Sequence, residues 1–311
     1  MLRLILRRVA WTIPVILLVI LMTFSMMKLI RGNPFQTQER DVPEAIQRNL
    51  ERQFNLDKPW YWQYAYYVKG VFTFDLGVSM RQRNRDVNDV VREHFPVSLK
   101  LGAMAMLFAI VFGIPLGIIA ALKQNTVWDY ASMAVVNAGF ALPNFLIATL
   151  LIYFFAVKWR EHTPFPTNGW GGWETWVLPV IALGHAPMTV LARIVRGSML
   201  ETLEQDYIRT AKAKGLRWRR VVGLHVLRNS LIPAVTAAGP LLGGLIAGSF
   251  IVETIFGIPG IGRYFIIAVG ARDYTVVMGI TVLFSVIIIL ANLVVDILYG
   301  FLDPRTRDVR T

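Results

Sequence analysis

The side chains that could carry chemistry are few and lie far apart in this sequence. The histidines are His94, His162, His185 and His225, and none of them shows metal-ligand spacing. The chain has no cysteine, which excludes disulfides and thiolate chemistry. It also has no Gly-x4-Gly-Lys-Ser/Thr segment that could hold nucleotide phosphates. We therefore expect no metal, no cofactor and no catalytic site on this chain.

A few polar residues inside apolar segments remain as candidates. Asp296 is the only acid deep within a predicted span, and an intramembrane carboxylate is a functional candidate by default. It lines a path, relays protons or, as we favour, pairs with Arg193. Asn137 and Asn144 are nearly two helical turns apart, so we expect them on one face, where they line a polar passage or bond neighbouring helices. We expect His185 to be a packed or hydrogen-bonded helix residue.

Composition indicates the environment of these residues. Only 17% of the 311 residues are charged and 55% are hydrophobic, whereas a soluble domain carries about a quarter charged residues. The net charge of +12 does not indicate nucleic-acid binding, because many basic residues flank apolar runs. The apolar N-terminal stretch is too long for a signal peptide and no small-residue cleavage site follows it. The sequence predicts an all-α integral membrane protein.

Six segments approach the roughly twenty apolar residues that a helix needs to cross a bilayer. They are Val9–Met27, Leu99–Leu122, Ala131–Val157, Trp176–Val195, Leu231–Val252 and Val276–Phe301. The fourth is the weakest, because Pro179 and Pro187 interrupt it, and it is alternatively a buried or re-entrant helix. In the fifth, small residues such as Gly239 and Gly243 are four apart, which predicts close helix packing.

Charge in the short flanking segments predicts the orientation. Lys and Arg concentrate beside both termini and in residues 209–228, so all three are expected in the cytoplasm. We divide the chain into residues 1–95, a first helix plus a long extracytoplasmic segment, and residues 96–311, a core of five spans. The extracytoplasmic segment contains the aromatic stretch PWYWQYAYYVKGVFTF. This is either a helix lying on the membrane interface or part of a small folded subdomain.

Residues 197–230 are too polar to remain in hydrocarbon, yet they are rich in helix formers. Ser198 followed by Glu201 has the pattern of a capping box, and Gly215 can end the helix as a C′ glycine. The segment therefore predicts a cytoplasmic helix, a glycine turn and a second helix.

Two interpretations of this loop compete. A purely electrostatic anchor to anionic lipid needs only positive charge. It does not need Ala211 and Ala213 beside the glycine turn, where small side chains leave room for another protein. We favour a protein-docking loop.

The sequence GIPGIG, near the end of the fifth span, is not a dinucleotide-binding motif, because no strand precedes it. As an extracytoplasmic turn it is either an ordinary tight turn or part of an outer gate or binding-protein contact. The candidate residues for the second interpretation are Gly257, Pro259, Gly260 and Gly262.

Several passages together resemble one transporter family. DYIRTAKAKGL followed by HVLRNSLIP, and also RGNPF, ETIFGIPGIGR and NLVVDILYGFLDPR, are similar to the B-type permease subunits of dipeptide, oligopeptide and nickel ABC importers. The coupling loop of such permeases carries Glu-Ala-Ala, three residues and Gly. Here Arg209, Thr210, Ala211 and Gly215 stand at those places, so the Glu and the first Ala are absent.

The resemblance implies partners and a role. Such a subunit pairs with a second permease subunit, two cytoplasmic ATPases that hold ATP and Mg, and an extracytoplasmic substrate-binding protein, and the complex imports peptides across the inner membrane. The expected ATPase contact comprises Asp206, Tyr207, Ile208, Arg209, Thr210, Ala211, Lys212, Ala213, Lys214 and Gly215. Import of nickel chelates or another small solute is an alternative within the family. An ion-coupled secondary transporter that uses Asp296 is an alternative of a different class.

Overall fold

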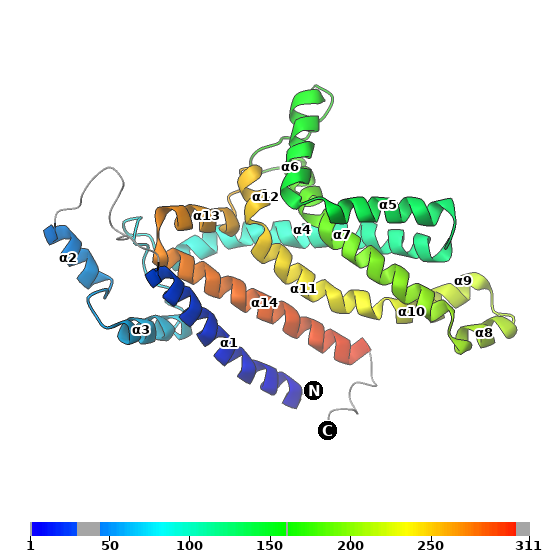
Figure 1. The fold of residues 1–311 in the computed structure, drawn as a ribbon, viewed down its shortest axis with the longest axis horizontal. Coiled ribbons are helices and arrows are strands. Elements are labelled where there is room, and N and C mark those ends of the chain that lie inside the picture. Colours follow the sequence, from blue (N-terminus) through cyan, green and yellow to red (C-terminus); the bar gives the residue numbers. More distant parts are fainter. Residues whose placement is uncertain (1, 30–43, 160, 303–311) are drawn as a thin grey trace. The chain divides into compact units, whose positions relative to one another are not determined.

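The computed structural model describes residues 2–29, 44–159 and 161–302. The passage RGNPF and the C-terminal residues from position 303 lie outside these ranges. The described residues contain helices and no strand, with one isolated antiparallel bridge between Val78 and Asp86. The chain divides into two compact units, whose helices are labelled in Figure 1. The N-terminal unit comprises Leu2–Ser98 and Pro259–Ile289, and the core unit comprises Leu99–Ile258 and the chain from Leu290 onward.

The N-terminal unit contains three helices of its own before α4 and receives parts of two long helices. Its elements are α1 (Leu2–Leu29), α2 (Glu44–Gln53), α3 (Trp60–Phe72), the start of α4 (Val87–Leu122), α13 (Ile261–Ala271) and the start of α14 (Tyr274–Leu302). Buried apolar side chains of α4, α13 and α14 form its hydrophobic cluster: Val87, Val90, Ile261, Ala268, Val276, Val277 and Ile280. The helix that contains the second predicted span therefore begins at Val87, before Leu99, and its first turns pack within this cluster.

Residues 44–86, within the segment predicted to be extracytoplasmic, have both exposed aromatic side chains and contacts with the rest of their unit. Helix α3 exposes Trp62 and Tyr66 with stacked rings, while its Tyr64 hydroxyl donates a hydrogen bond to the Leu17 carbonyl of α1 at 2.9 Å. Further along, the Ser79 hydroxyl donates a hydrogen bond to the buried Asp273 carboxylate. The segment therefore has an aromatic exposed face and a folded part that is fixed to the start of α14.

The core unit is built around α7 (Glu174–Leu203). The helices before it are the remainder of α4, α5 (Val127–Ala141), α6 (Asn144–Ile152) and the π-helix η1 (Tyr153–Lys158). Those after it are α8 (Asp206–Ala213), α9 (Trp218–Arg220), the π-helix η2 (Val221–Val226), α10 (Leu227–Ser230), α11 (Ile232–Gly248) and α12 (Phe250–Ile255).

Glycines set the distance between α4 and α7. A Cβ atom built on Gly113 would lie 2.5 Å from the Met188 carbonyl oxygen, and one on Gly117 would lie 2.5 Å from that of Ala192. These approaches are too close for any side chain, so the two backbones pack directly against one another. The close packing predicted for the fifth span is confirmed at Gly239, whose Cβ would collide with the Val295 side chain of α14.

The predicted spans fit the described helices with one clear exception. By length and composition five described helices can cross a membrane, and a sixth crossing requires α5 and α6–η1 to count as one span although they are bent by 101°. A single helix over residues 131–157 is therefore wrong. Leu142 is extended (φ −94°, ψ 122°) because the residue before a proline avoids the helical region, and Pro143 has no N–H to continue the helix.

The prolines were expected to interrupt the fourth span, and this part of the prediction is wrong, although the segment is the least apolar of the five candidate helices, as expected. Helix α7 is continuous over 30 residues with Pro179 and Pro187 inside it. Its most apolar window is 61% buried, against 39% or less for the other four candidate helices. Because protein surrounds α7, neighbouring groups can satisfy the carbonyls that the prolines leave free.

Candidate coupling site

The polar segment starts as an extension of α7 and not as a new helix. Ser198 lies inside α7, where its carbonyl accepts a hydrogen bond from the Thr202 hydroxyl at 2.7 Å. The predicted capping box of Ser198 and Glu201 is therefore wrong, because the preceding apolar helix leaves no free N-terminus there. The chain leaves the helix after Leu203, and Gln205 is extended (ψ 144°) before α8 begins.

Gly215 ends α8 as predicted. Its φ of +78° lies in the left-handed region, which side chains disfavour. The Gly215 N–H donates to the Lys212 carbonyl at 2.9 Å, and the Leu216 N–H donates to the Ala211 carbonyl at 3.4 Å. This pair of bonds is a Schellman motif, and it satisfies two helix-end carbonyls while reversing the chain.

One face of α8 packs against its own chain. Ile208 is fully buried and Ala211, three residues on, is 8% exposed. They lie on the side of α8 that contacts η2, whose buried side chains are Val221, Val222 and Val226. The expectation that Ala211 leaves room for a partner is therefore wrong. Its small side chain instead permits close packing between α8 and η2 within this chain.

Two further contacts hold the loop closed. The Asn229 side-chain amide of α10 donates to the Tyr207 hydroxyl of α8 at 2.9 Å. The Lys212 ammonium lies 4.5 Å from the centre of the Trp218 ring, within the range of a cation–π interaction. Thus α8, the Gly215 turn and the helices that follow form one small folded element.

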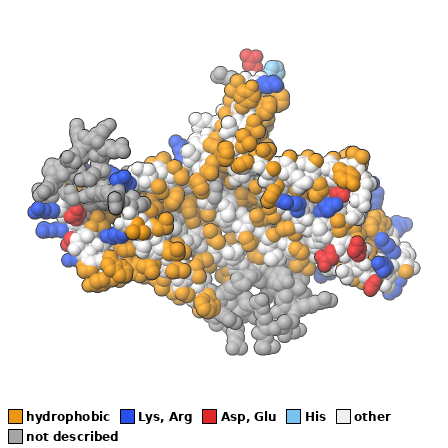
Figure 2. All heavy atoms as spheres, in the orientation of Figure 1, with side chains coloured by type: hydrophobic (Ala, Val, Ile, Leu, Met, Phe, Trp, Pro, Cys, Tyr) orange, Lys and Arg blue, Asp and Glu red, His pale blue; other side chains and the backbone are white. Residues whose placement is uncertain are grey.

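The outer surface of this element is polar and basic. The predicted contact residues exposed on it are Asp206, Tyr207, Arg209, Thr210, Lys212, Ala213, Lys214 and Gly215. Beside them a shallow pocket is lined by Gly215, Leu216, Arg217, Arg219 and Arg220. Figure 2 shows Lys and Arg side chains gathered over α8 and α9. The Arg209–Asp206 pair, at 3.6 Å, is too exposed to neutralise this surface.

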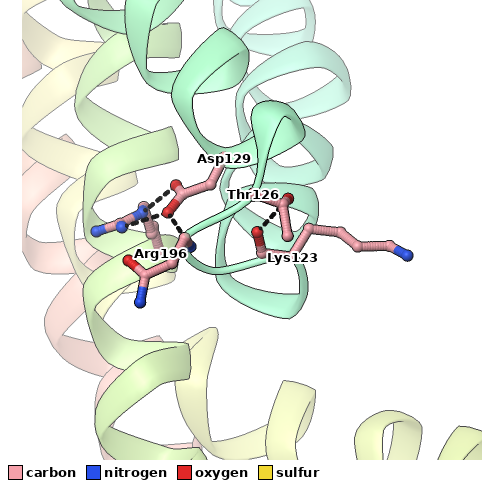
Figure 3. Close-up of polar contacts among 5 residues, drawn as sticks. Lys123, Thr126, Asp129 and Arg196 are labelled. Atoms are coloured by element: carbon pink, nitrogen blue, oxygen red, sulfur yellow. Dashed lines mark hydrogen bonds and ion pairs between the residues drawn. The ribbon is translucent and has the colours of Figure 1, made fainter.

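A buried ion pair lies on α7 before the loop. The Arg196 guanidinium donates from Nε to Asp129 Oδ1 at 2.8 Å and from a terminal nitrogen to Oδ2 at 2.9 Å. Asp129, at the start of α5, also accepts a hydrogen bond from the Asn125 N–H at 3.1 Å (Figure 3). The Asp129 side chain is 4% exposed and that of Arg196 is 28% exposed. This bidentate geometry is the strong form of a charged hydrogen bond.

The predicted path residues do not form one face. Asn137 is exposed on α5 and Asn144 begins α6, so the bend separates them and the expected common face is wrong. The Asp296 side chain lies outside the described residues, and its pairing with Arg193 stays a prediction. The Arg193 guanidinium carbon lies 3.8 Å from the centre of the Phe140 ring.

His185 is a packed, hydrogen-bonded residue, as expected. It is 6% exposed, with Nδ1 2.9 Å from the Ala182 carbonyl oxygen and Nε2 3.1 Å from that of Leu142. The second contact supplies a partner for the carbonyl at the bend between α5 and α6. Among the described residues, no cluster of three or more His, Asp or Glu side chains could hold a metal ion.

The GIPGIG turn is packed against its own chain at both ends. In the core unit, Gly257 has a φ of +63°, and a Cβ on it would lie 2.0 Å from Asn168 Oδ1. In the N-terminal unit, the Pro259 carbonyl oxygen lies 2.9 Å from His94 Nδ1, while Gly260 and Gly262 are buried. Only Pro259 among the four candidates is classed as exposed, so the gate or binding-protein role stays a prediction.

Comparison with known proteins identifies the family. Residues 113–308 match the model of the binding-protein-dependent transport system inner membrane component, and residues 1–102 match the model of its N-terminal region. The chain belongs to this permease family. It is accordingly a non-catalytic membrane subunit, and the predicted family resemblance is confirmed.

Relatives of this permease are similar over nearly its whole length. It is 46% identical over 292 residues to the dipeptide transport system permease protein of Bacillus subtilis, covering 94% of both chains. It is 42% identical to the oligopeptide transport system permease protein of Escherichia coli K12, covering 99% of this chain and 100% of the relative.

Solved structures share the fold of the permease at low sequence identity. A methionine ABC transporter in an inward-facing conformation aligns with a TM-score of 0.56 and 18% identity, covering 69% of this chain and 96% of that chain. An amino acid ABC transporter aligns with a TM-score of 0.52 and 14% identity, covering 70% and 94%. These likenesses confirm the fold of an ABC importer membrane subunit.

Sequence reasoning missed several buried polar groups of the permease. One of them is Glu253, one residue beyond the predicted fifth span, which is fully buried in α12 and accepts a hydrogen bond from the Ser249 hydroxyl. The Asp129–Arg196 pair was also missed. The available signal was that each of these two charges borders an apolar segment, where a buried charge requires a partner.

Proposed function

We propose that this permease forms, together with a second related permease subunit, the path by which dipeptides or oligopeptides cross the bacterial or archaeal inner membrane. Two cytoplasmic ATPases, which carry ATP and Mg, drive the path, and an extracytoplasmic binding protein delivers the substrate. In this arrangement both termini and α8 face the cytoplasm, in accordance with the distribution of Lys and Arg. The permease itself binds no cofactor.

The observation that carries this proposal is the folded loop at the end of α7, in a chain whose relatives are named peptide permeases. The exposed basic surface of α8 and the Gly215 turn is the site offered to the ATPase. Because α7 continues directly from the apolar core to this loop, a displacement of α8 is transmitted to the membrane helices. ATP-driven closure of the ATPases then switches the path between inward-facing and outward-facing states.

Peptide uptake by the complete complex in proteoliposomes tests the proposal. ATP is added on the side of the vesicle membrane that carries the ATPases. A labelled dipeptide, a labelled longer peptide and a nickel chelate are offered in parallel as substrates. We expect ATP-dependent peptide uptake that an uncoupler does not abolish. Selective uptake of the nickel chelate would mean that the substrate is the nickel chelate and not a peptide. Uptake without ATP that collapses with an uncoupler would contradict the importer assignment and favour an ion-coupled transporter.

A further inference from the structure

Helix α5 is fastened to α7 at three places along its length. At its start, Asp129 forms the bidentate pair with Arg196. Near its end, a Cβ on Gly139 would lie 2.7 Å from the Thr189 side chain, so the helices touch closely there. Immediately after its end, the Leu142 carbonyl meets His185 Nε2 at 3.1 Å.

These contacts describe two antiparallel helices in register. The contact positions ascend along α5 from residue 129 to 139 to 142 while those on α7 descend from 196 to 189 to 185. At a rise of about 1.5 Å per residue the outer contacts span about 20 Å on α5 and about 17 Å on α7. The similar lengths mean that α5 follows α7 over the whole distance from the ion pair to the bend.

The start of α5 has few other attachments. Val127 is 80% exposed, Trp128 is 66% exposed and Tyr130 is 67% exposed, whereas Asp129 between them is 3% exposed. The apolar side chains on either side of Asp129 therefore make few contacts with the rest of the described chain. The ion pair is the directional contact there, and a two-pronged Arg–carboxylate pair restricts rotation as well as separation.

Arg196 also lies close to the coupling loop along the chain. Helix α7 ends at Leu203 and α8 begins at Asp206, so Arg196 sits within about two turns of the end of α7. At the far end of α5 the chain turns by 101° into α6. Without the ion pair, a displacement of α8 that moved α7 would reach this bend only through the contacts at Gly139 and Leu142.

We propose that Asp129 and Arg196 are a positioning pair that makes α5 and α7 move as one body, so that displacement of α8 reaches the bend at Leu142–Pro143. The inference rests on the proposed coupling role of α8. The pair touches no substrate and no nucleotide, and it acts by keeping the two helices in register. Without it α7 moves while the start of α5 lags, and ATP hydrolysis proceeds with less transport.

The test uses the complete complex in proteoliposomes with Asp129→Asn and Arg196→Gln. The first measurement is the ratio of peptide imported to ATP hydrolysed. We expect this ratio to fall by about fivefold or more, which is the lower end of the factors by which distant sites affect one another. Arg196→Lys, which keeps the charge but loses the two-pronged geometry, is expected to give an intermediate ratio. Lys123→Gln is the matched control, because its exposed charge points away from the pair, and it is expected to keep the wild-type ratio (Figure 3).

The second measurement is the distance between spin labels on the exposed residues Val135 of α5 and Glu201 of α7. The chain has no cysteine, so Val135→Cys and Glu201→Cys are the only labelling sites on it, and a complex without these two substitutions gives the background from the partner subunits. We expect one narrow distance, equal with and without ATP, in the wild-type background, and a broader, ATP-dependent one in Asp129→Asn. If neither single variant assembles, Asp129→Ala with Arg196→Ala leaves no buried charge unpaired and gives the same two readings.

Unchanged transport ratio and unchanged label distance in the assembled variants would overturn the inference. The inference would also be overturned if the distance between the two labels changed with ATP as strongly in the wild-type background as in Asp129→Asn. These outcomes are distinct from failure of the proposed function, in which the wild-type complex imports no peptide with ATP, or Gly215→Pro retains full ATP-driven uptake.

Discussion

The side chains of Tyr207 and Asn229 join the two ends of the polar loop that follows α7 although they are 22 positions apart in the chain. The hydrogen bond connects α8 with α10, which leads directly into α11. A force on α8 therefore has two routes into the core unit, backward along α7 and forward through this bond.

We expect Asn229→Ala and Tyr207→Phe to loosen this forward route. Each removes one partner of an exposed hydrogen bond, so the loss in free energy of unfolding is about 0.5–1 kcal/mol. ATP-driven uptake should fall a few-fold while membrane insertion persists. Purified single and double variants would be compared by thermal unfolding and by uptake. Additive effects in the double variant would show that the two residues act separately.

Gly215 offers a sharper test of the turn. Gly215→Pro removes the N–H that bonds the Lys212 carbonyl and imposes a φ near −65° where the turn has +78°. We expect loss of ATPase co-purification and of ATP-driven uptake. Gly215→Asn, which tolerates the left-handed conformation better than other side chains, should retain most activity. Equal activity of both variants would exclude a role for this geometry.

The opposite orientations of Ala211 and Ala213 give a matched pair of substitutions. Ala211→Glu places a carboxylate in the packed side of α8, so we expect α8 to detach from η2 and proteases to cleave the loop faster. Ala213→Glu changes only an exposed residue and should leave the protease pattern unchanged while weakening ATPase binding. Limited proteolysis with quantitative pull-down of the ATPases separates these effects. The reverse assignment of the two phenotypes would contradict the described packing.

Close packing of α4 on α7 should make Gly113 intolerant of larger residues. A leucine side chain there meets the Met188 backbone, which cannot move aside, so we expect a loss of about 1–3 kcal/mol in free energy of unfolding. Gly244→Ala is the control, because no atom lies within 4 Å of the added Cβ and alanine favours a helix. Thermal unfolding in detergent compares the two. A tolerated Gly113→Leu would mean that α4 and α7 separate in the functional state.

The sequence was sufficient to predict the helical class, the family and the position of the glycine turn, because each depends on local chemistry. An apolar run of twenty residues indicates a membrane helix wherever it occurs. The turn at Gly215 was predictable because glycine adopts the left-handed conformation that ends a helix. The bend at Leu142–Pro143 was also local, yet it was missed because an apolar run hid a single proline. Composition over a window averages out the residue that breaks a helix.

Partners in space were not predictable in the same way. The pairing of Asp129 with Arg196 joins residues 67 positions apart, and nothing in their spacing selects Arg196 over Arg193, less than one helical turn away. The capping box failed for a similar reason, since Ser198 and Glu201 fit the pattern but lie inside a helix that begins in the membrane. A local pattern such as Ser198 and Glu201 does not show whether the residues before it are already helical, and here the packing of the earlier turns of α7 keeps them helical.

Asp273 connects the segment before α4 to the start of α14. Its carboxylate accepts from the Val276 N–H as an N-cap, from the Met80 N–H at 3.1 Å and from the Ser79 hydroxyl. Asp273→Ala leaves three donors without this acceptor, and we expect a loss of about 2–3 kcal/mol in free energy of unfolding, the sum of a lost cap and unsatisfied buried donors. Asp273→Asn retains an acceptor and should cost less than half as much.

Proteolysis of the loop before α4 measures this attachment directly. Arg81 donates from Nε to the Ala271 carbonyl at 2.6 Å, so the loop also lies against the end of α13. When Asp273 no longer holds Ser79, trypsin should cut at the exposed Arg83 several times faster, and Ser79→Ala should give a smaller increase. The effects of the two substitutions should not add, because both break the same contact. Cleavage at the wild-type rate in Asp273→Ala would show that the hydrophobic cluster alone holds the segment to α14.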